Sequence, residues 1–467
     1  MSDYGAGAGN SPAPYKVPSG GLRLSVKQLL RRRTLHGGVT LGLISGETPV
    51  PNHGVAVPAG GALNHSGLLM VALSIVGGVP SGGDRMAMEL ARRWPTIGGP
   101  ITVLTTIEGV RLIHDLEISN VNTQVLTGLG TSSRMVSLAY FLRTLISPIA
   151  VLRAIRGARP RIVLSATLFP PDVVAALVAR ALGASWVHSW QLVIPPPGRG
   201  YQLTGRRWSL QRPPSPVEVV SVVRHGLSYL SQNLSLLFAR RWCKTLVVPT
   251  QLMASVALQR GFKHDQIHVA NYGIDLAEVE NGIAHRATAW NEHCDGIFVG
   301  QFRAQKGLAD LVDVWKRVQE RLPLARLAVV GDGTGLAAAQ FKSQLKEFRN
   351  GTVSLLGVIS GPEKFAAVSG ARVFLFPSHH ESWGLVALEA MAAGVPVVGY
   401  DIPSSREAFG DAMLRVAAYD VDAFADAVVL CLRDESTRET YRQRGIQLAK
   451  SYDWDRVARQ FAQRVLE

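Results

Sequence analysis

The chain has 467 residues, a length that suggests two or three domains. Hydrophobic residues make up 47% of it and charged residues 18%, so we expect a packed core and exclude wholesale disorder. The three cysteines lie far apart (Cys243, Cys294 and Cys431), which excludes a zinc ribbon, argues against a disulfide framework and favours a reducing compartment. Residues 1–20 lack the apolar region of a signal peptide, and no apolar run is long and uninterrupted enough for a membrane span.

Positive charge is concentrated in the first half of the chain. The net charge is +14, but residues 1–250 hold 25 Lys and Arg against 9 Asp and Glu, whereas the remaining residues are slightly acidic. Residues 134–244 hold 15 basic residues and only two acidic ones. This half therefore predicts an anionic partner: lipid headgroups, nucleic acid or a phosphorylated substrate.

The first 66 residues are interpreted as a flexible, basic extension. Residues 21–35 fit either a short basic amphipathic helix or a disordered cationic arm. Residues 36–66, rich in Gly, Pro, Asn and His, are interpreted as irregular.

A first α/β unit begins at the apolar run 68–76, which a glycine-rich loop and a helical pattern follow. This order is typical of the start of a doubly wound parallel sheet. Further strands are predicted at 101–105, 161–165, 185–188 and 246–250, and helices at 172–182, 217–242 and 251–260.

A second α/β unit begins near residue 296 and alternates five predicted strands with helices. The strands are 296–300, 326–331, 353–357, 371–378 and 396–400. The helices are 307–321, 335–348, 362–369, 384–393 and 422–433, and an amphipathic helix is expected at 453–467. The chain thus divides into an extension (1–66), a first Rossmann-like domain (67–270), a second one (271–452) and a terminal helix (453–467).

The most informative segment is 377–398, PSHHESWGLVALEAMAAGVPVV. A strand ends before it, and a helix is expected to start near Gly384, where free backbone N–H groups and the helix dipole favour an anion. Glu381 precedes that helix and Glu389 lies within it, about 12 Å further along the axis at 1.5 Å per residue. Two carboxylates at that distance suit opposite ends of an extended anionic ligand better than one acid–base pair.

This segment resembles the signature of retaining glycosyltransferases of family 4 (group 1 glycosyltransferases), which have the GT-B fold. The resemblance covers about residues 67–467 and is more specific in the second half. It implies two doubly wound Rossmann-like domains facing a central cleft, with the last helix crossing back to the first domain. It also implies that Glu381 contacts a donor sugar and that Glu389 holds the ribose of a nucleotide. The remaining donor contacts would come from Ser382, Trp383, Gly384, Leu385 and Val386; Ser382-Trp383 replaces the common Gly-Phe.

A second motif, VGQFRAQKG at 299–307, would supply cations to the donor diphosphate. Lys306 matches the lysine of the family, whereas Gln301 stands where the family has arginine. Arg303 either substitutes for that arginine or is an ordinary surface cation.

Other candidate residues lie at predicted strand ends. The glycine loop after the first strand (Gly77, Gly78, Gly82 and Gly83) either lines the acceptor side or makes a tight turn. His188 is either a catalytic residue near the donor sugar, as the resemblance implies, or a buried structural histidine. Gly331 and Gly333 either border the nucleotide or form a plain strand-to-helix turn.

Two Asp-x-Asp strings, at 420–422 and 453–455, are interpreted as helix caps rather than metal ligands, so no metal or other cofactor is expected. The arginines among the apolar runs of 134–161 and 206–244 suit either helices lying on an anionic membrane or helices packed in the first domain. A nucleic-acid partner is not expected, because no binding motif is present.

The resulting hypothesis is a retaining, nucleotide-sugar-dependent hexosyltransferase. Its donor would be a UDP- or GDP-sugar and its acceptor a membrane-associated lipid-linked compound or glycan, in glycoconjugate or polysaccharide synthesis. We expect a cytoplasmic protein, peripheral on the inner face of the plasma membrane. A sugar-nucleotide epimerase of the same fold and a non-catalytic donor-binding module remain alternatives.

Overall fold

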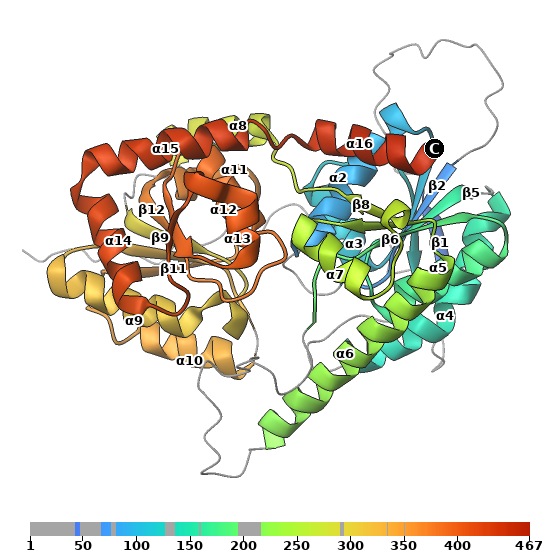
Figure 1. Ribbon diagram of the computed structural model, residues 1–467, viewed down its shortest axis with the longest axis horizontal. Helices are drawn as coiled ribbons and strands as arrows, with labels where there is room; N and C mark the ends of the chain where they lie inside the picture. Colours follow the sequence, from blue (N-terminus) through green and yellow to red (C-terminus); the bar gives the residue numbers. More distant parts are fainter. Residues whose placement is uncertain are drawn as a thin grey trace, which may run out of the picture. The chain divides into compact units, whose positions relative to one another are not determined.

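The computed structural model describes residues 43–46, 67–75, 81–126, 136–157, 160–194, 216–289, 294–333, 335–349 and 351–467 (Figure 1). Several positions considered above lie outside this set: Gly77, Gly78, residues 134–135, 158–159 and 206–215 of the two arginine-rich runs and, except for 43–46, the extension 1–66. In the described part, no helix is long and apolar enough to cross a membrane.

The first sheet has eight strands in the order β1-β4-β3-β2-β5-β6-β7-β8. All neighbours pair in parallel except β1, which pairs antiparallel with β4. The strands are β1 (Leu43–Gly46), β2 (Gly67–Ala72), β3 (Ile101–Thr105), β4 (Asn122–Leu126), β5 (Pro160–Ser165), β6 (Ser185–Ser189), β7 (Thr245–Val248) and β8 (Ile267–Val269). The prediction of wholly irregular structure over 36–66 is wrong at β1.

Side-chain alternation along β2 explains why helices cover both faces of this sheet. Leu68 and Met70 pack with α2 and α3, whereas Leu69 and Val71 pack with α4 to α7. The helices are α2 (Gly82–Ile97), α3 (Ile107–Asp115), α4 (Val136–Gly157), α5 (Pro170–Ala181), α6 (Pro216–Trp242) and α7 (Gln251–Gln259).

Arg143 of α4 is not one of the surface cations that the sequence suggested. It is 2% exposed, and its guanidinium donates hydrogen bonds to the carbonyl oxygens of Leu73 (3.1 Å) and Ile75 (3.2 Å). Burial lowers the pKa of Arg143, although Glu108 opposes this effect. Arg143 therefore ties α4 to the end of β2.

The second sheet is entirely parallel, in the order β11-β10-β9-β12-β13-β14. Its strands are β9 (Cys294–Val299), β10 (Leu327–Val330), β11 (Val353–Gly357), β12 (Ala371–Phe376), β13 (Val397–Tyr400) and β14 (Leu414–Val416). The five predicted strands are present, and β14 is a sixth that the sequence did not reveal.

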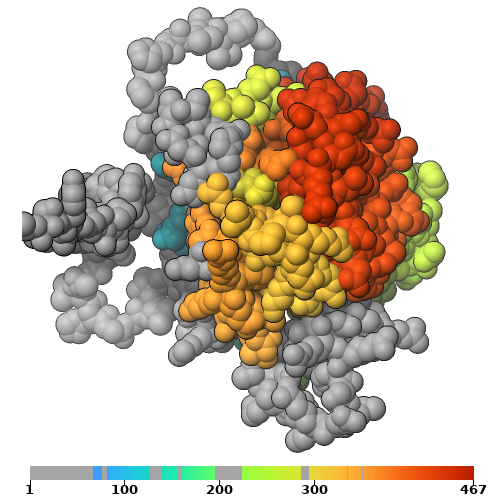
Figure 2. Space-filling view, turned by 90° about the vertical axis from the view of Figure 1, so that its left-hand side faces the viewer, coloured from blue at the N-terminus to red at the C-terminus, as the bar shows by residue number. Residues whose placement is uncertain are grey.

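Helices cover both faces of the second sheet as well. Phe374 of β12 packs with α8, α11 and α12, whereas Leu375 packs with α9, α10 and α14. Figure 2 shows α9 and α10, in yellow and orange, beside α14 and α15 in red. The helices are α8 (Leu276–Ala289), α9 (Leu308–Arg321), α10 (Leu336–Leu345), α11 (Gly361–Ser369), α12 (Leu385–Ala392), α13 (Pro403–Phe409), α14 (Val421–Arg433) and α15 (Glu435–Ala449).

The last helix, α16 (Trp454–Leu466), packs against α2 of the first sheet (Figure 1). The rings of Phe461 and Trp94 meet edge to face with centroids 5.9 Å apart, and Arg93 pairs with Asp455. The expected α/β class, with two doubly wound units and a returning terminal helix, is confirmed.

Candidate functional site

The loop between β12 and α12 places a partly buried carboxylate beside an ammonium group. Ser378 Oγ donates a hydrogen bond to Glu381 Oε1 (2.9 Å), and Lys306 Nζ donates to the same oxygen (2.5 Å). The side chains of Glu381 and Lys306 are 10% and 22% exposed, so the pair is only partly shielded from water. The two residues that the sequence placed on the donor are therefore in direct contact.

Gly307 explains how Lys306 reaches this position. A short 3₁₀ turn, η2 (Ala304–Lys306), follows β9 and ends at Gly307, whose φ is +69°. A β-carbon on Gly307 would lie 1.9 Å from the carbonyl oxygen of Pro377. Only glycine allows the loop after β9 to lie directly against the loop after β12.

The start of α12 combines free amides with a buried indole. Gly384, at φ +107°, precedes the first helical residue, Leu385, so the amides of Leu385 and Val386 lie in the turn where intrahelical acceptors are lacking. Trp383 is fully buried, and its ring packs against Phe409 and Tyr452. The Trp383 side chain thus anchors the loop, and only its backbone is available to a ligand.

Glu389 lies one helical turn into α12 and is 10% exposed. Its Oε1 accepts a hydrogen bond from Lys364 Nζ at 2.7 Å. Burial tends to lower the pKa of Arg85 on α2, but the charges of Glu89, Glu278 and Glu389 raise it above the usual value. Glu389 is therefore within electrostatic range of the first sheet's helix α2.

Tyr272 links this loop to the glycine loop of the first sheet. A β-carbon on Gly82 would lie 3.0 Å from the Tyr272 ring, and the Tyr272 hydroxyl donates to Gln191 Oε1 at 2.9 Å. Burial raises the pKa of Tyr272, and a hydrogen bond with Ser382 opposes this. Tyr272 could not be found from the sequence, because its position just after β8 carries no motif.

Gly83 and Arg303 also reach this region. A β-carbon on Gly83 would meet the Gln191 side chain at 3.3 Å. Arg303 is exposed, and its charge lowers the pKa of Asp84, although burial of Asp84 has the larger, opposite effect. Arg303 therefore lies near the amino end of α2.

His188 is not exposed at this site. It is fully buried at the end of β6, with Nδ1 2.7 Å from Ser165 Oγ, which also accepts a hydrogen bond from Trp186 Nε1. Burial lowers the pKa of His188 to about 3, so the ring is neutral at physiological pH. Its Nε2 has no partner among the described residues.

Gly331 and Gly333 are required by close packing. A β-carbon on Gly331, whose φ is +132°, would lie 1.9 Å from the Gly300 carbonyl oxygen. A β-carbon on Gly333 would lie 2.7 Å from the Phe302 carbonyl oxygen. Both glycines therefore support the loop that carries Lys306, and a contact with nucleotide stays a prediction.

The two Asp-x-Asp strings act as helix caps, as predicted. Asp420 Oδ1 accepts a hydrogen bond from the amide of Ala423 (2.9 Å), and Asp453 Oδ1 accepts one from the amide of Asp455 (2.9 Å). Within the described ranges, no group of three or more His, Cys, Asp or Glu residues is arranged to hold a metal ion.

The two doubly wound sheets, the helix α16 that returns to the first of them, and the contact between the loops after β9 and β12 together define the GT-B architecture. Solved structures share it: a protein from Anabaena (Alr3699/HepE, in complex with UDP and glucose) has a TM-score of 0.63 at 15% identity. Sucrose-phosphate synthase from Thermosynechococcus elongatus has a TM-score of 0.62 at 17% identity. Each alignment covers 85% of this chain and 98% of the other.

Residues 294–434 match the model of the family "Glycosyl transferases group 1", which confirms the resemblance found in the sequence. The phosphatidyl-myo-inositol mannosyltransferase of Mycobacterium leprae (strain TN) is 33% identical over 203 residues, 40% of this chain and 52% of that protein. The O-antigen chain mannosyltransferase B of Escherichia coli is 38% identical over 112 residues, 24% and 29% of the two chains. This chain therefore spans about half the length of the mycobacterial relative, and less of the second.

Proposed function

We propose that this protein is a retaining glycosyltransferase that moves a hexosyl group from a nucleotide-diphosphate sugar to an acceptor hydroxyl. The observation that carries the proposal is the contact of Lys306 with Glu381 at the start of α12. A cation, free helix-start amides and a carboxylate at one place match the charges and hydroxyls of such a donor. The names of the relatives support hexosyl transfer, and UDP in a structural neighbour supports a nucleotide donor.

In this proposal, each residue acts on a different part of the donor. Lys306 and the amides of Leu385 and Val386 stabilise negative charge on the departing diphosphate. Glu381 accepts hydrogen bonds from the sugar, and Glu389 accepts them from the ribose. The acceptor hydroxyl attacks the anomeric carbon on the face that the diphosphate leaves and gives its proton to the departing phosphate oxygen, so the anomeric configuration is retained.

Arg303 is proposed to supply the second cation for the diphosphate, in place of the arginine absent at position 301. Arg303 is exposed and lies on the same loop as Lys306, whose amide donates a hydrogen bond to the Arg303 carbonyl oxygen (2.9 Å), and this position supports the role. Replacing Arg303 by Ala should raise the KM for the donor, whereas Arg349→Ala, at an exposed position in the second unit, should leave it unchanged. Equal KM values for both variants would contradict the role of Arg303.

The acceptor is proposed to be a lipid-linked compound or glycan at the inner face of a membrane. The relative that acts on phosphatidyl-myo-inositol supports a lipid acceptor. His188 is proposed to contact the donor sugar after a rearrangement of the end of β6, because its ring is buried in the structure.

The test is to incubate the purified full-length chain with UDP- and GDP-hexoses and a membrane lipid extract. We expect release of nucleoside diphosphate together with a glycosylated lipid of retained anomeric configuration, determined by NMR. Donor consumption without a glycosidic product would favour an epimerase, and donor binding without turnover would favour a binding module. Either result would overturn the proposal.

A further inference from the structure

Helix α4 exposes a row of large apolar side chains. Phe141, Leu145, Ile149 and Leu152 follow one another at intervals of three or four residues, and each is 44–60% exposed. The opposite side of α4 packs on the sheet through Ala150 and Val151. Because one apolar side of α4 packs on the sheet, the other apolar side is left in contact with water, and an exposed apolar surface of this kind commonly marks an interaction site.

Helix α6 has the same property. Val223, Leu227, Leu230, Leu234 and Leu237 are 46–61% exposed and again recur every three or four residues. The opposite side of α6 packs into the same core as α4, through Leu236 and Ala239. The two rows therefore lie on the outer side of one helix layer.

Helix α5 joins the two rows, because it packs against both α4 and α6. Its outer residues Val174, Leu177 and Val178 are half-buried and apolar, and the exposed Leu182 follows its end. Among the described side chains of these three helices, the one carboxylate is that of Asp172, which is fully buried. The outer face of α4, α5 and α6 is therefore apolar and nearly free of acidic side chains among the described residues.

Exposed cations gather at one end of this face. Arg153, Arg180 and Arg241 lie at the carboxyl ends of α4, α5 and α6, and Lys244 precedes β7. Because these helices return antiparallel to the strands, all four lie toward the amino edge of the sheet, opposite the edge that carries the candidate site. In the described part of the chain, none of the four pairs with a carboxylate.

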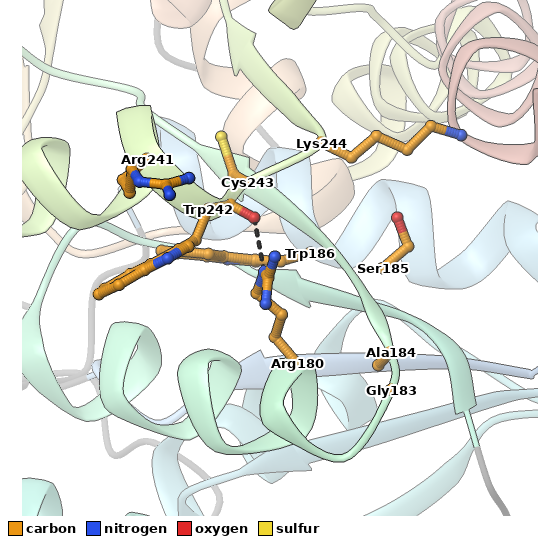
Figure 3. Close-up of a pocket in the computed structure, with 9 residues that line it drawn as sticks. All are labelled: Arg180, Gly183, Ala184, Ser185, Trp186, Arg241, Trp242, Cys243 and Lys244. Carbon is orange, nitrogen blue, oxygen red and sulfur yellow. Dashed lines mark hydrogen bonds between the residues drawn. The ribbon is translucent and has the colours of Figure 1, made fainter.

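Three of these cations line a cavity of about 490 Å³ (Figure 3). Arg180 Nε donates a hydrogen bond to the Trp242 carbonyl oxygen (2.8 Å), which orients the guanidinium and leaves its terminal N–H groups available. Arg241 lies at the same end, whereas Lys244 points to the side of Ser185. A helix C-terminus attracts cations, but this effect does not explain Lys244 or a lining without any acid. The cavity suits a phosphate group.

We propose that this protein docks on an anionic lipid bilayer through the outer face of α4, α5 and α6, with a lipid phosphate beside Arg180 and Arg241 and with Lys244 as a further cation at the edge of the cavity. Apolar rows suit the headgroup–acyl boundary, and flanking cations add electrostatic attraction to anionic lipids. A bilayer would contact both the apolar rows and the cations, whereas a nucleic acid would contact only the cations. The inference rests on the proposed function for a membrane-held acceptor, but docking is measured without sugar transfer.

The test is co-sedimentation of the full chain with phosphatidylcholine vesicles, with or without phosphatidylglycerol, at low and high salt. We expect binding to the anionic vesicles that weakens at high salt. The double variant Arg241→Gln/Lys244→Gln should bind roughly 30-fold more weakly, since each cation near an anionic surface contributes about a factor of five. Leu227→Gln/Leu234→Gln should also lose binding, because it removes the apolar row. Thermal melts verify that both variants are folded.

Matched controls lie in the second unit: Lys346→Gln/Arg349→Gln for charge, and Leu324→Gln, at a 73% exposed position, for apolar surface. Both should bind like the unchanged chain, and so should Lys306→Ala, which tests sugar transfer separately. No binding, equal binding to neutral vesicles, or unchanged binding by either double variant would overturn the proposal. The proposal would also be overturned if the chain formed a dimer that Leu227→Gln/Leu234→Gln dissociates while vesicle binding stays unchanged. In that case a second copy of the chain, and not a bilayer, would cover this face.

Discussion

Lys306 Nζ lies 2.5 Å from Glu381 Oε1, so each of these residues neutralises the other across two loops of the second sheet. Lys364 and Glu389 form a second such pair at 2.7 Å. Both acids of the sequence signature are therefore paired with lysines. A diphosphate would compete with Glu381 for Lys306, and this exchange would leave the carboxylate able to accept hydrogen bonds from a sugar.

Replacing Lys306 by Ala should lower kcat/KM for donor turnover by about 100- to 1000-fold, because a cation that stabilises the leaving group acts mainly in the transition state. Nucleoside diphosphate release measures the effect. The control is Lys316→Ala, an exposed lysine of α9 that pairs with Glu347. If both variants turn over donor at the same rate, Lys306 has no role in the reaction.

Replacing Glu389 by Gln should raise the KM for the donor about tenfold with little change in kcat, because a ribose contact is equally strong before and during the reaction. Steady-state kinetics with varied donor separate the two constants. Glu363→Gln, at an exposed position of the neighbouring helix α11, should leave both unchanged. A large fall in kcat alone would contradict a ribose contact.

Asp172 should make the folded chain less stable as the pH rises. Burial raises the pKa of Asp172 to about 7, despite hydrogen bonds from Thr167 and the Leu73 amide. Between the ordinary carboxyl pKa of about 4 and that value, the folded chain keeps a proton that the unfolded chain has lost. This contribution to stability is fully present below about pH 4 and is lost as the pH approaches 7.

The measurement is the free energy of unfolding of the unchanged chain and of Asp172→Asn at about pH 5 and about pH 8. The variant should gain stability relative to the unchanged chain at the higher pH, since asparagine stays neutral. Asp115→Asn, at an exposed position, serves as the control. An identical pH dependence for Asp172→Asn and the unchanged chain would show that Asp172 is ionised in the fold.

Replacing Gly331 by Ala should destabilise the fold by about 2–4 kcal/mol, because it combines a positive φ with a β-carbon 1.9 Å from the Gly300 carbonyl oxygen. Gly351, at φ +83°, has no atom within 4 Å of such a β-carbon. Gly351→Ala should therefore cost only about 1 kcal/mol, from the positive φ alone. Chemical denaturation compares the two, and equal losses would mean that the contact with Gly300 relaxes freely.

The central strands of both sheets could be predicted, because buried parallel strands appear as continuous apolar runs. β14 could not, since its three residues are half-exposed and carry no such run. Helix α15 was also missed: Gly445 and Ala449 are its buried residues, so its sequence lacks an apolar stripe.

A shared region for Lys306 and Glu381 could be predicted because each belongs to a local motif at a strand end, but their direct ion pair was not expected. Tyr272 and Arg143 could not, because their roles depend on distant segments. Tyr272 meets Gln191, 81 residues away, and the carbonyl acceptors of Arg143 lie 68 and 70 residues before it. A buried arginine and a surface arginine look alike until the fold supplies those acceptors.

The packing of α16 on α2 also constrains when the protein can fold. Trp94 and its neighbours in α2 pack against Phe461 and Val457, which lie more than 350 residues later in the sequence. Domains commonly fold one after another during translation. Here the apolar face of α2 that α16 covers stays exposed to solvent until α16 has been translated. A nascent chain halted before that point would expose this surface of α2 to chaperones. Deleting α16 would lower the stability of the unit built on the first sheet, although α16 follows the second sheet in the sequence.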